Sequence, residues 1–200
     1  RTQKRVPIGQ SRSRGFGRRQ NNGTRASALD PSRYINKSAA LPMGAPYEAT
    51  HTFADFGLNA QVVDRVNRRG YLTPTPIQDE AIPVVMTGSD VIGLADTGTG
   101  KTAVFLLPLI HKILADRTQK ALIIVPTREL AVQINDELRA FSAGLAIYSA
   151  VCIGGNGYGQ QIRDLSRRPQ FVIGTPGRLK DHLERRTLRC LGLVAQLHHL

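Results

Sequence analysis

The chain has 200 residues, which suits one domain of ordinary size together with an extension. Hydrophobic residues make up 41%, enough to form a buried core, but no apolar run approaches the roughly 18 residues that span a bilayer. The two cysteines, Cys152 and Cys190, give neither a disulfide framework nor a Cys-x-x-Cys pair. These features exclude a membrane-spanning or disulfide-stapled protein and favour one in the reducing cytoplasm.

The formal net charge is +12, and it is spread unevenly along the chain. Residues 1–50 hold ten Lys and Arg against two Asp and Glu, whereas residues 51–200 hold seventeen against thirteen. An excess of positive charge in one segment indicates a polyanionic partner, most simply nucleic acid. Charge alone does not separate RNA from DNA or anionic lipid, and the alternative of a solubilising linker stays open.

Residues 1–50 are predicted to form a disordered basic tail and linker. Arg, Gly, Ser, Gln and Asn dominate residues 11–25, and apolar residues are scattered there without a period. The segment from Arg14 to Arg19 is similar to Arg-Gly segments that bind single strands through charge and stacking. Because the chain begins with Arg1 rather than methionine, we also expect a fragment or a processed product.

From Phe53 onward the sequence predicts a folded α/β domain, residues 51–200. A helical pattern covers Leu58 to Arg69 and stops at Gly70, and a second helix begins at Pro76 after its predicted N-cap, Thr75. We then expect strands at 91–94, 121–125, 147–153 and 171–173, alternating with helices at 101–115, 128–141, 158–166 and 176–186. Such alternation predicts a parallel sheet with helices on both faces, whose ligands bind at the carboxyl ends of the strands.

A glycine-rich loop lies between the first predicted strand and the helix that follows it. Its sequence is Ala95-Asp96-Thr97-Gly98-Thr99-Gly100-Lys101-Thr102. Gly98 and Gly100 lack a Cβ atom, so the backbone can turn its N–H groups toward phosphate, and the helix adds the positive end of its dipole. We expect Lys101 to contact the β- and γ-phosphates of a nucleotide and the Thr102 hydroxyl to ligate Mg²⁺. A turn that merely links strand to helix is the alternative.

A second motif covers Gly70 to Gln78, with Phe53 seventeen residues before Gly70. The side-chain amide of Gln78 can donate and accept hydrogen bonds at once, which matches the Hoogsteen edge of adenine. Tyr71 can stack on the base. Gln78 also fits a capping box with Thr75, and both roles can hold together because a capped helix start fixes the glutamine.

The Gly70 to Gln78 segment and its upstream Phe53 resemble the Q motif of DEAD-box RNA helicases. In that family the carbonyl just before the first proline, here that of Thr73, also meets adenine. Three further segments resemble family motifs in the expected order: motif Ia (Pro126, Thr127, Arg128, Glu129), the paired glycines (Gly154, Gly155) and motif Ib (Thr175, Pro176, Gly177, Arg178). The resemblance implies that these residues grip the sugar–phosphate backbone of a single strand of RNA without reading its bases.

The resemblance also implies a RecA-like P-loop NTPase domain, the first of two such domains in a full-length ATP-dependent RNA helicase. ATP and Mg²⁺ are the implied cofactors, and single-stranded RNA or a short duplex is the implied partner. A P-loop ATPase acting on DNA is one alternative, although the adenine-type Q motif argues against it. A short RNA-binding module without ATPase activity is the other.

The acidic motif that names the family, Asp-Glu-x-Asp, is absent from the 200 residues, and no acidic residue follows Glu184. In the family its carboxylates hold Mg²⁺ and help to activate water. The last stretch, Leu191 to Leu200, looks like the lead-in to the strand that carries this motif. We therefore expect an incomplete domain, with the nucleotide pocket and part of the RNA track, that does not itself hydrolyse ATP.

Overall fold

The computed structural model of this chain describes residues 47–96, 98–189 and 193–198, so most of the predicted tail lies outside the described part. The helices are α1 (Ala60–Arg68), α2 (Pro76–Met86), α3 (Lys101–Ala115), α4 (Arg128–Phe141), α5 (Tyr158–Ser166) and α6 (Pro176–Glu184). The strands are β1 (Lys120–Ile124), β2 (Ser149–Cys152), β3 (Phe171–Gly174) and β4 (Leu193–His198). Within these ranges, no helix is both long enough and apolar enough to cross a membrane.

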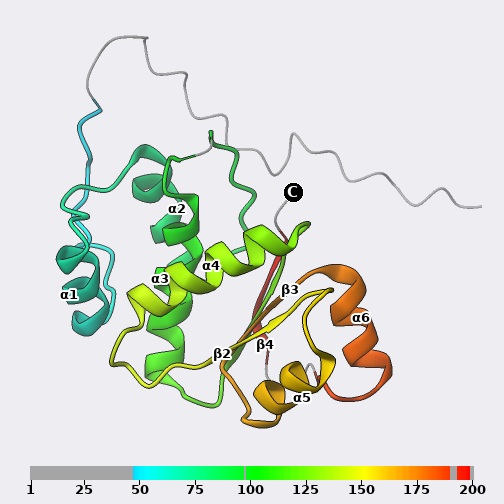
Figure 1. The fold of residues 1–200 in the computed structure, drawn as a ribbon. Coiled ribbons are helices and arrows are strands. Elements are labelled where there is room, and N and C mark those ends of the chain that lie inside the picture. The colour runs from blue at the N-terminus through cyan, green and yellow to red at the C-terminus, as the bar shows by residue number, and fades with distance from the viewer. Residues whose placement is uncertain (1–46, 97, 190–192, 199–200) are drawn as a thin grey trace, which may run out of the picture.

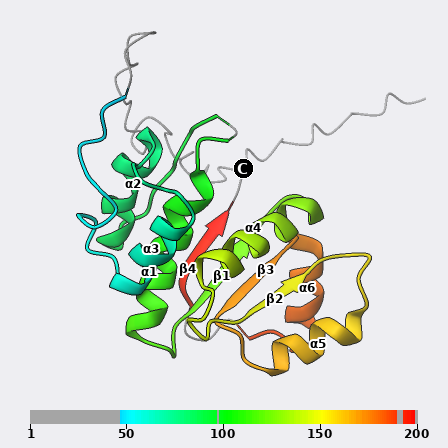
Figure 2. The same ribbon diagram turned by 60° about the vertical axis from the view of Figure 1, so that its left-hand side comes forward.

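The strands form one parallel sheet, seen nearly edge-on in Figure 1, and Figure 2 shows their order β2-β3-β1-β4. In its register Ala121 of β1 lies opposite Phe171 of β3. Because all the strands run in the same direction, their carboxyl ends meet at one edge of the sheet. The loops that leave this edge after β1, β2 and β3 begin the segments of Pro126, Gly154 and Thr175, three of the predicted RNA contacts.

Alternate residues of the strands face two separate cores. Ala121 and Ile123 of β1 lie in the larger core, together with residues of α1 to α4. Leu122, between them, lies in the smaller core with Leu165 of α5 and Leu179 of α6. Successive strand residues point to opposite faces of a sheet, and Figure 2 shows the strands between α1 to α3 and the pair α5 and α6. The predicted α/β fold, with helices on both faces of a parallel sheet, is confirmed.

The predicted strand at residues 91–94 is wrong in this structure. Val91, Ile92 and Leu94 are exposed, and the segment lies outside the sheet. The backbone groups of a strand need a neighbouring strand to pair with, and none of the described strands pairs with this segment. Apolar residues suit a strand, but they do not supply the neighbouring strand with which it must pair. The prediction rested on composition alone and was therefore wrong.

Candidate functional site

The glycine-rich loop that is predicted to bind phosphate, here called the phosphate loop, ends where α3 begins, at Lys101. Gly100 is the N-cap residue and has a φ of 82°, in the left-handed region that glycine adopts without strain. A Cβ atom at this position would also overlap the side-chain amide of Gln78. Glycine at position 100 is therefore required both by the turn and by the close approach of α2.

The loop is held partly by its own side chains. The ammonium group of Lys101 donates a hydrogen bond to the carbonyl of Ala95, across the mouth of the loop. The hydroxyl of Thr99 donates to the carbonyl of Asp96 at 2.8 Å. Thr97 lies outside the described residues, so its predicted nucleotide contact stays a prediction. The cation that was predicted to meet phosphate is thus bound to a carbonyl of the same loop.

The first turn of α2 fastens the phosphate loop from the other side. The Thr75 hydroxyl donates to the carbonyl of Thr99 at 2.7 Å, and the Gln78 amide nitrogen donates to the carbonyl of Gly100 at 3.1 Å. The Gln78 amide oxygen accepts from the backbone N–H of Thr75 at 3.0 Å, which is one half of the predicted capping box. Two side chains of the Q motif therefore determine where the phosphate loop lies.

Gln78 is fully buried, with 0% of its surface exposed. Its hydrogen bonds to described residues use one of the two amide hydrogens and one of the two oxygen lone pairs. One hydrogen and one lone pair therefore remain for a ligand such as adenine. A base can reach them only after the groups that cover the side chain have moved.

Tyr71, which was predicted to stack on the base, and Phe53, the aromatic residue upstream of the motif, both pack against other side chains. Phe53 is 2% exposed, and its ring lies edge-on to Tyr71 at a centroid distance of 6.5 Å. The Tyr71 ring also meets Phe141 of α4 at 5.7 Å, and the guanidinium group of Arg69 lies 4.5 Å from the Phe141 ring centroid. This cluster joins the segments around α1 to α4. Base stacking by Tyr71 and a nucleotide contact by Phe53 stay predictions. Thr73, whose carbonyl is the other predicted adenine contact, is exposed.

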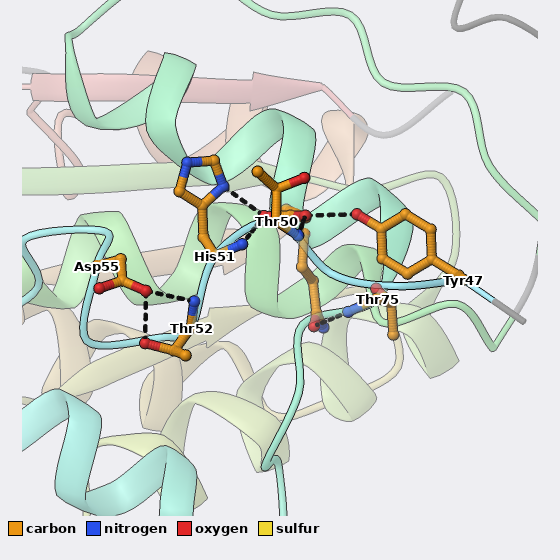
Figure 3. A network of polar contacts seen from close by, with 8 residues as sticks. Tyr47, Thr50, His51, Thr52, Asp55 and Thr75 are labelled. Carbon is orange, nitrogen blue, oxygen red and sulfur yellow. Dashed lines mark hydrogen bonds and ion pairs between the residues drawn. The ribbon is translucent and has the colours of Figure 1, made fainter.

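The buried carboxylate of Asp79 fastens residues 47–51, here called the incoming chain, to α2; Figure 3 shows its partners Tyr47, Thr50 and His51. Asp79 accepts hydrogen bonds from the Tyr47 hydroxyl at 2.5 Å, from the Thr50 backbone N–H at 2.7 Å, and from the backbone and ring of His51 at 3.2 and 2.6 Å. These contacts start at residue 47, so the packed chain begins within the segment that the sequence assigned to the tail.

The same contacts shift two pKa values in opposite directions. Burial opposes ionisation of Asp79, but the hydrogen bonds from the incoming chain outweigh it and hold the pKa of this carboxyl below its ordinary value. Burial, together with the adjacent Asp79 carboxylate, raises the pKa of Tyr47 to about 12. A charged carboxylate paired with a neutral phenol is therefore the stable form of this contact.

Motif Ia and the paired glycines meet at the carboxyl edge of the sheet. Thr127 caps α4, since its hydroxyl accepts from the backbone N–H of Leu130 at 3.2 Å. The Arg128 guanidinium lies over Gly154 and Gly155, so close that a Cβ atom on Gly155 would come within 2.5 Å of an Arg128 nitrogen. Pro126 and Glu129 are exposed beside them. This arrangement brings an arginine together with a glycine turn that has no side chains to cover its backbone, as phosphate binding requires.

Motif Ib begins the next loop along the same edge. Thr175 is the N-cap of α6, and Arg178 lies in the first turn. An Arg178 nitrogen donates to the carbonyl of Asn156 at 3.5 Å, and the guanidinium carbon lies 5.4 Å from the Tyr158 ring centroid. Pro176 and Gly177 are exposed. Motif Ib and the paired-glycine loop are therefore in direct contact.

A groove of about 790 Å³ runs between α4 and the paired-glycine loop. Two arginines and three carboxylates line it, together with smaller or neutral residues; the charged ones are Arg69, Arg128, Glu129, Asp136 and Glu137. Only its end beside Arg128 and the paired glycines suits a phosphate, because the acidic side of α4 repels anions along the rest.

Sequence reasoning missed three residues that organise these loops: Asp79, Gln161 and His182. Asp79 stands in the first turn of a helix, where an acidic residue is so common that it signals nothing. Gln161 and His182 are separated by 21 positions but joined by a hydrogen bond. His182 is fully buried and hydrogen-bonded through both ring nitrogens. No pattern in the sequence links such a pair before the fold is known.

A parallel sheet with helices on both faces, and a glycine-rich Gly-Lys-Thr loop that opens a helix, define a RecA-like P-loop NTPase domain. Residues 75–195 match the protein family described as DEAD/DEAH box helicase. The chain belongs to that family.

Two named relatives are similar over most of this chain. The ATP-dependent RNA helicase CshA of Listeria monocytogenes is 49% identical over 138 residues, which cover 68% of this chain and 26% of that protein. The ATP-dependent RNA helicase DeaD of Buchnera aphidicola is 46% identical over 151 residues, covering 74% and 24%. The chain thus spans about a quarter of the length of the curated relatives it matches.

Proposed function

We propose that this chain supplies the nucleotide pocket and part of the RNA track of an ATP-dependent RNA helicase. One observation carries the proposal: the Gln78 amide is bonded to Gly100, which brings a side chain suited to adenine beside the loop suited to phosphate. The names of the two relatives support the same activity. In such an enzyme, ATP binding closes two domains over RNA, a short duplex is locally unwound, and hydrolysis resets the protein.

On the nucleotide side, Lys101 would exchange its bond to Ala95 for the β- and γ-phosphates, and the N-terminus of α3 would add its dipole. Thr102 offers one hydroxyl ligand for Mg²⁺. Among the described residues, no group of three or more acidic, His or Cys side chains could hold a metal. In the family the carboxylates of Asp-Glu-x-Asp hold Mg²⁺, and in the full-length helicase they would do so together with Thr102. When bound, Mg²⁺ would neutralise phosphate charge.

On the RNA side, the exposed backbone at Gly155 and the helix starts at Thr127 and Thr175 would contact phosphates, with Arg128 and Arg178 as cations. None of these groups reads a base, so binding is proposed to be independent of sequence. The basic tail, residues 1–50, would add further non-specific affinity. A second RecA-like domain and a cytoplasmic location belong to the same proposal.

The adenine assignment is tested by nucleotide competition in the full-length protein. We expect it to prefer ATP over GTP, and Gln78→Ala to reduce that preference by roughly tenfold, the worth of one hydrogen bond. Gln61→Ala, which changes an exposed glutamine on α1, is the matched control and should leave the preference intact. Equal affinity of the unmutated protein for ATP and GTP would contradict the proposal.

A further inference from the structure

The paired-glycine loop has no side chain of its own at Gly154 or Gly155, so its position must be set by its neighbours. From inside the fold, the neighbour is Gln161 of α5, which is 3% exposed. Its amide nitrogen donates to the carbonyl of Ile153 at 2.9 Å and to the carbonyl of Asn156 at 3.3 Å. These two carbonyls bracket the glycines, so one amide group holds both ends of the loop.

The oxygen of the same amide is held by the next helix. It lies 3.0 Å from Nε2 of His182 in α6, a residue with no exposed surface. Because the Gln161 oxygen can only accept, Nε2 must carry the hydrogen. In the neutral ring Nδ1 then accepts from the Thr187 hydroxyl, 2.8 Å away, whose one hydrogen is shared with the backbone carbonyl of His182 at 3.1 Å. Burial lowers the pKa of His182, which favours this neutral form.

A second contact runs parallel to this bridge. The Tyr158 ring stacks on His182 with a centroid distance of 4.6 Å and an interplanar angle of 7°. The Arg178 guanidinium lies over Tyr158, and it donates to the same Asn156 carbonyl that Gln161 holds. The loop and the first turn of α6 are therefore joined both through the buried bridge and through Arg178 at the surface.

We propose that Gln161 and His182 are positioning residues for RNA binding, which hold the paired-glycine loop and the motif Ib helix in one fixed arrangement. The inference rests on the proposed RNA function of these two segments. Every hydrogen-bonding group of the bridge has a partner, so the arrangement is well defined, and loss of one member leaves another polar group buried without one. The two segments grip neighbouring phosphates only while their separation is maintained.

A pair of similar substitutions at His182 tests the bridge without emptying the core. Glutamine carries its amide at the level of Nε2, so His182→Gln can still donate to Gln161. Asparagine carries its amide at the level of Nδ1, so His182→Asn keeps the Thr187 contact and loses the bridge. In the full-length protein we expect His182→Asn to raise the dissociation constant for a single-stranded RNA about tenfold, equivalent to about 1.4 kcal/mol. His182→Gln should bind RNA nearly as the unmutated protein does.

Gln161→Leu should weaken RNA binding as His182→Asn does, and the double variant should add little, because both changes break the same contact. Gln160→Leu is the matched control, since the side chain of this exposed neighbour bonds, among the described residues, only to Asp164 and Arg163 on its own helix. ATP affinity and thermal stability are measured for each variant, and ATP affinity should not change.

Equal RNA affinity of the His182→Asn and His182→Gln proteins, both folded, would overturn the inference. So would additive effects in the double variant. If the unmutated full-length protein binds no RNA, the proposed function itself fails, and this outcome is separate from a failure of the bridge.

Discussion

Two buried glutamines hold two glycine loops in this fold, and they do so differently. Gln78 donates one hydrogen bond to the phosphate loop, and one hydrogen of its amide has no partner among the described residues. Gln161 donates both amide hydrogens to carbonyls of the paired-glycine loop, and its oxygen accepts from His182. Among the described contacts, Gln78 therefore keeps one amide hydrogen that it can donate to a ligand, whereas Gln161 keeps none.

The net charge also differs between two parts of the folded chain. Residues 51–156, which include the phosphate loop, hold nine Lys and Arg against ten Asp and Glu. Residues 157–189, which form α5, β3 and α6, hold eight against three. The positive excess of the folded part therefore lies in α5, β3 and α6, the elements that follow the paired-glycine loop. An RNA backbone needs an attractive surface of fixed shape, whereas a nucleotide is bound by a few directed groups.

The largest expected effect is a loss of ATP turnover that leaves RNA binding unchanged. Lys101→Ala should lower RNA-stimulated ATP turnover of the full-length protein by roughly 100-fold or more, since the loop loses its side-chain cation at the transferring phosphate. RNA affinity without nucleotide should be unchanged. The 200-residue chain alone should show no more turnover than this variant, because it lacks Asp-Glu-x-Asp. Turnover of the chain above that of the variant, measured by phosphate release, would contradict this prediction.

The next expected effect concerns how tightly β2, β3 and α6 pack together around Gly174. A Cβ atom on Gly174 would overlap the Cys152 carbonyl and come within 3.0 Å of Leu179, so β2, β3 and α6 would all have to move. We expect Gly174→Ala to reduce the free energy of unfolding by about 1–3 kcal/mol. Gly159→Ala on α5, where a Cβ atom would meet only an Arg163 nitrogen at 3.6 Å, is the control and should not destabilise. Equal denaturation midpoints for both variants would show that the strands can adjust.

The smallest effect concerns the incoming chain at Asp79. The pKa of Tyr47 is raised to about 12, so its contact stabilises the fold below pH 10 and is lost as pH rises from about 10 to 12. The depressed pKa of Asp79 has the opposite sign: its contribution is present above the ordinary carboxyl pKa and is lost as pH falls through the folded value.

Tyr47→Phe should therefore cost about 1–2 kcal/mol at neutral pH, the worth of a hydrogen bond to a charged group, and should flatten the alkaline limb of the stability curve. Chemical denaturation at pH 8 and at pH 11 measures both effects. Tyr148→Phe, at an exposed tyrosine beside β2, serves as the control. An alkaline limb that is identical in the two variants would show that the Tyr47 contact does not contribute to folding.

Sequence patterns predicted most of the elements, because local rules decide where helices begin. Thr75, Thr127 and Thr175 each precede a helix as expected. The strand predicted at 91–94 failed because pairing depends on which strand lies alongside, and this information is not local. The α/β alternation survived that error, since each remaining strand is followed by the expected loop.

For the candidate site, motifs identified the residues but not the state in which they are held. The sequence indicated that Gln78 suits adenine, but its burial and its bond to Gly100 come from packing of α2 against the phosphate loop. The bridge between Gln161 and His182 could not be predicted at all, because two amphipathic helices of ordinary composition carry it. Hydrogen bonds between residues that are far apart in the sequence depend on the fold and cannot be read from the local pattern.

The covered position of Gln78 has a consequence for the rate of nucleotide binding. Because the amide is bonded to Gly100 and Lys101 is bonded to Ala95, an arriving nucleotide meets groups that are already engaged. Contact with them must wait for an internal opening, whose rate does not depend on how much nucleotide is present. The observed association rate should then level off at high nucleotide concentration, and that plateau reports how often the phosphate loop and the first turn of α2 separate.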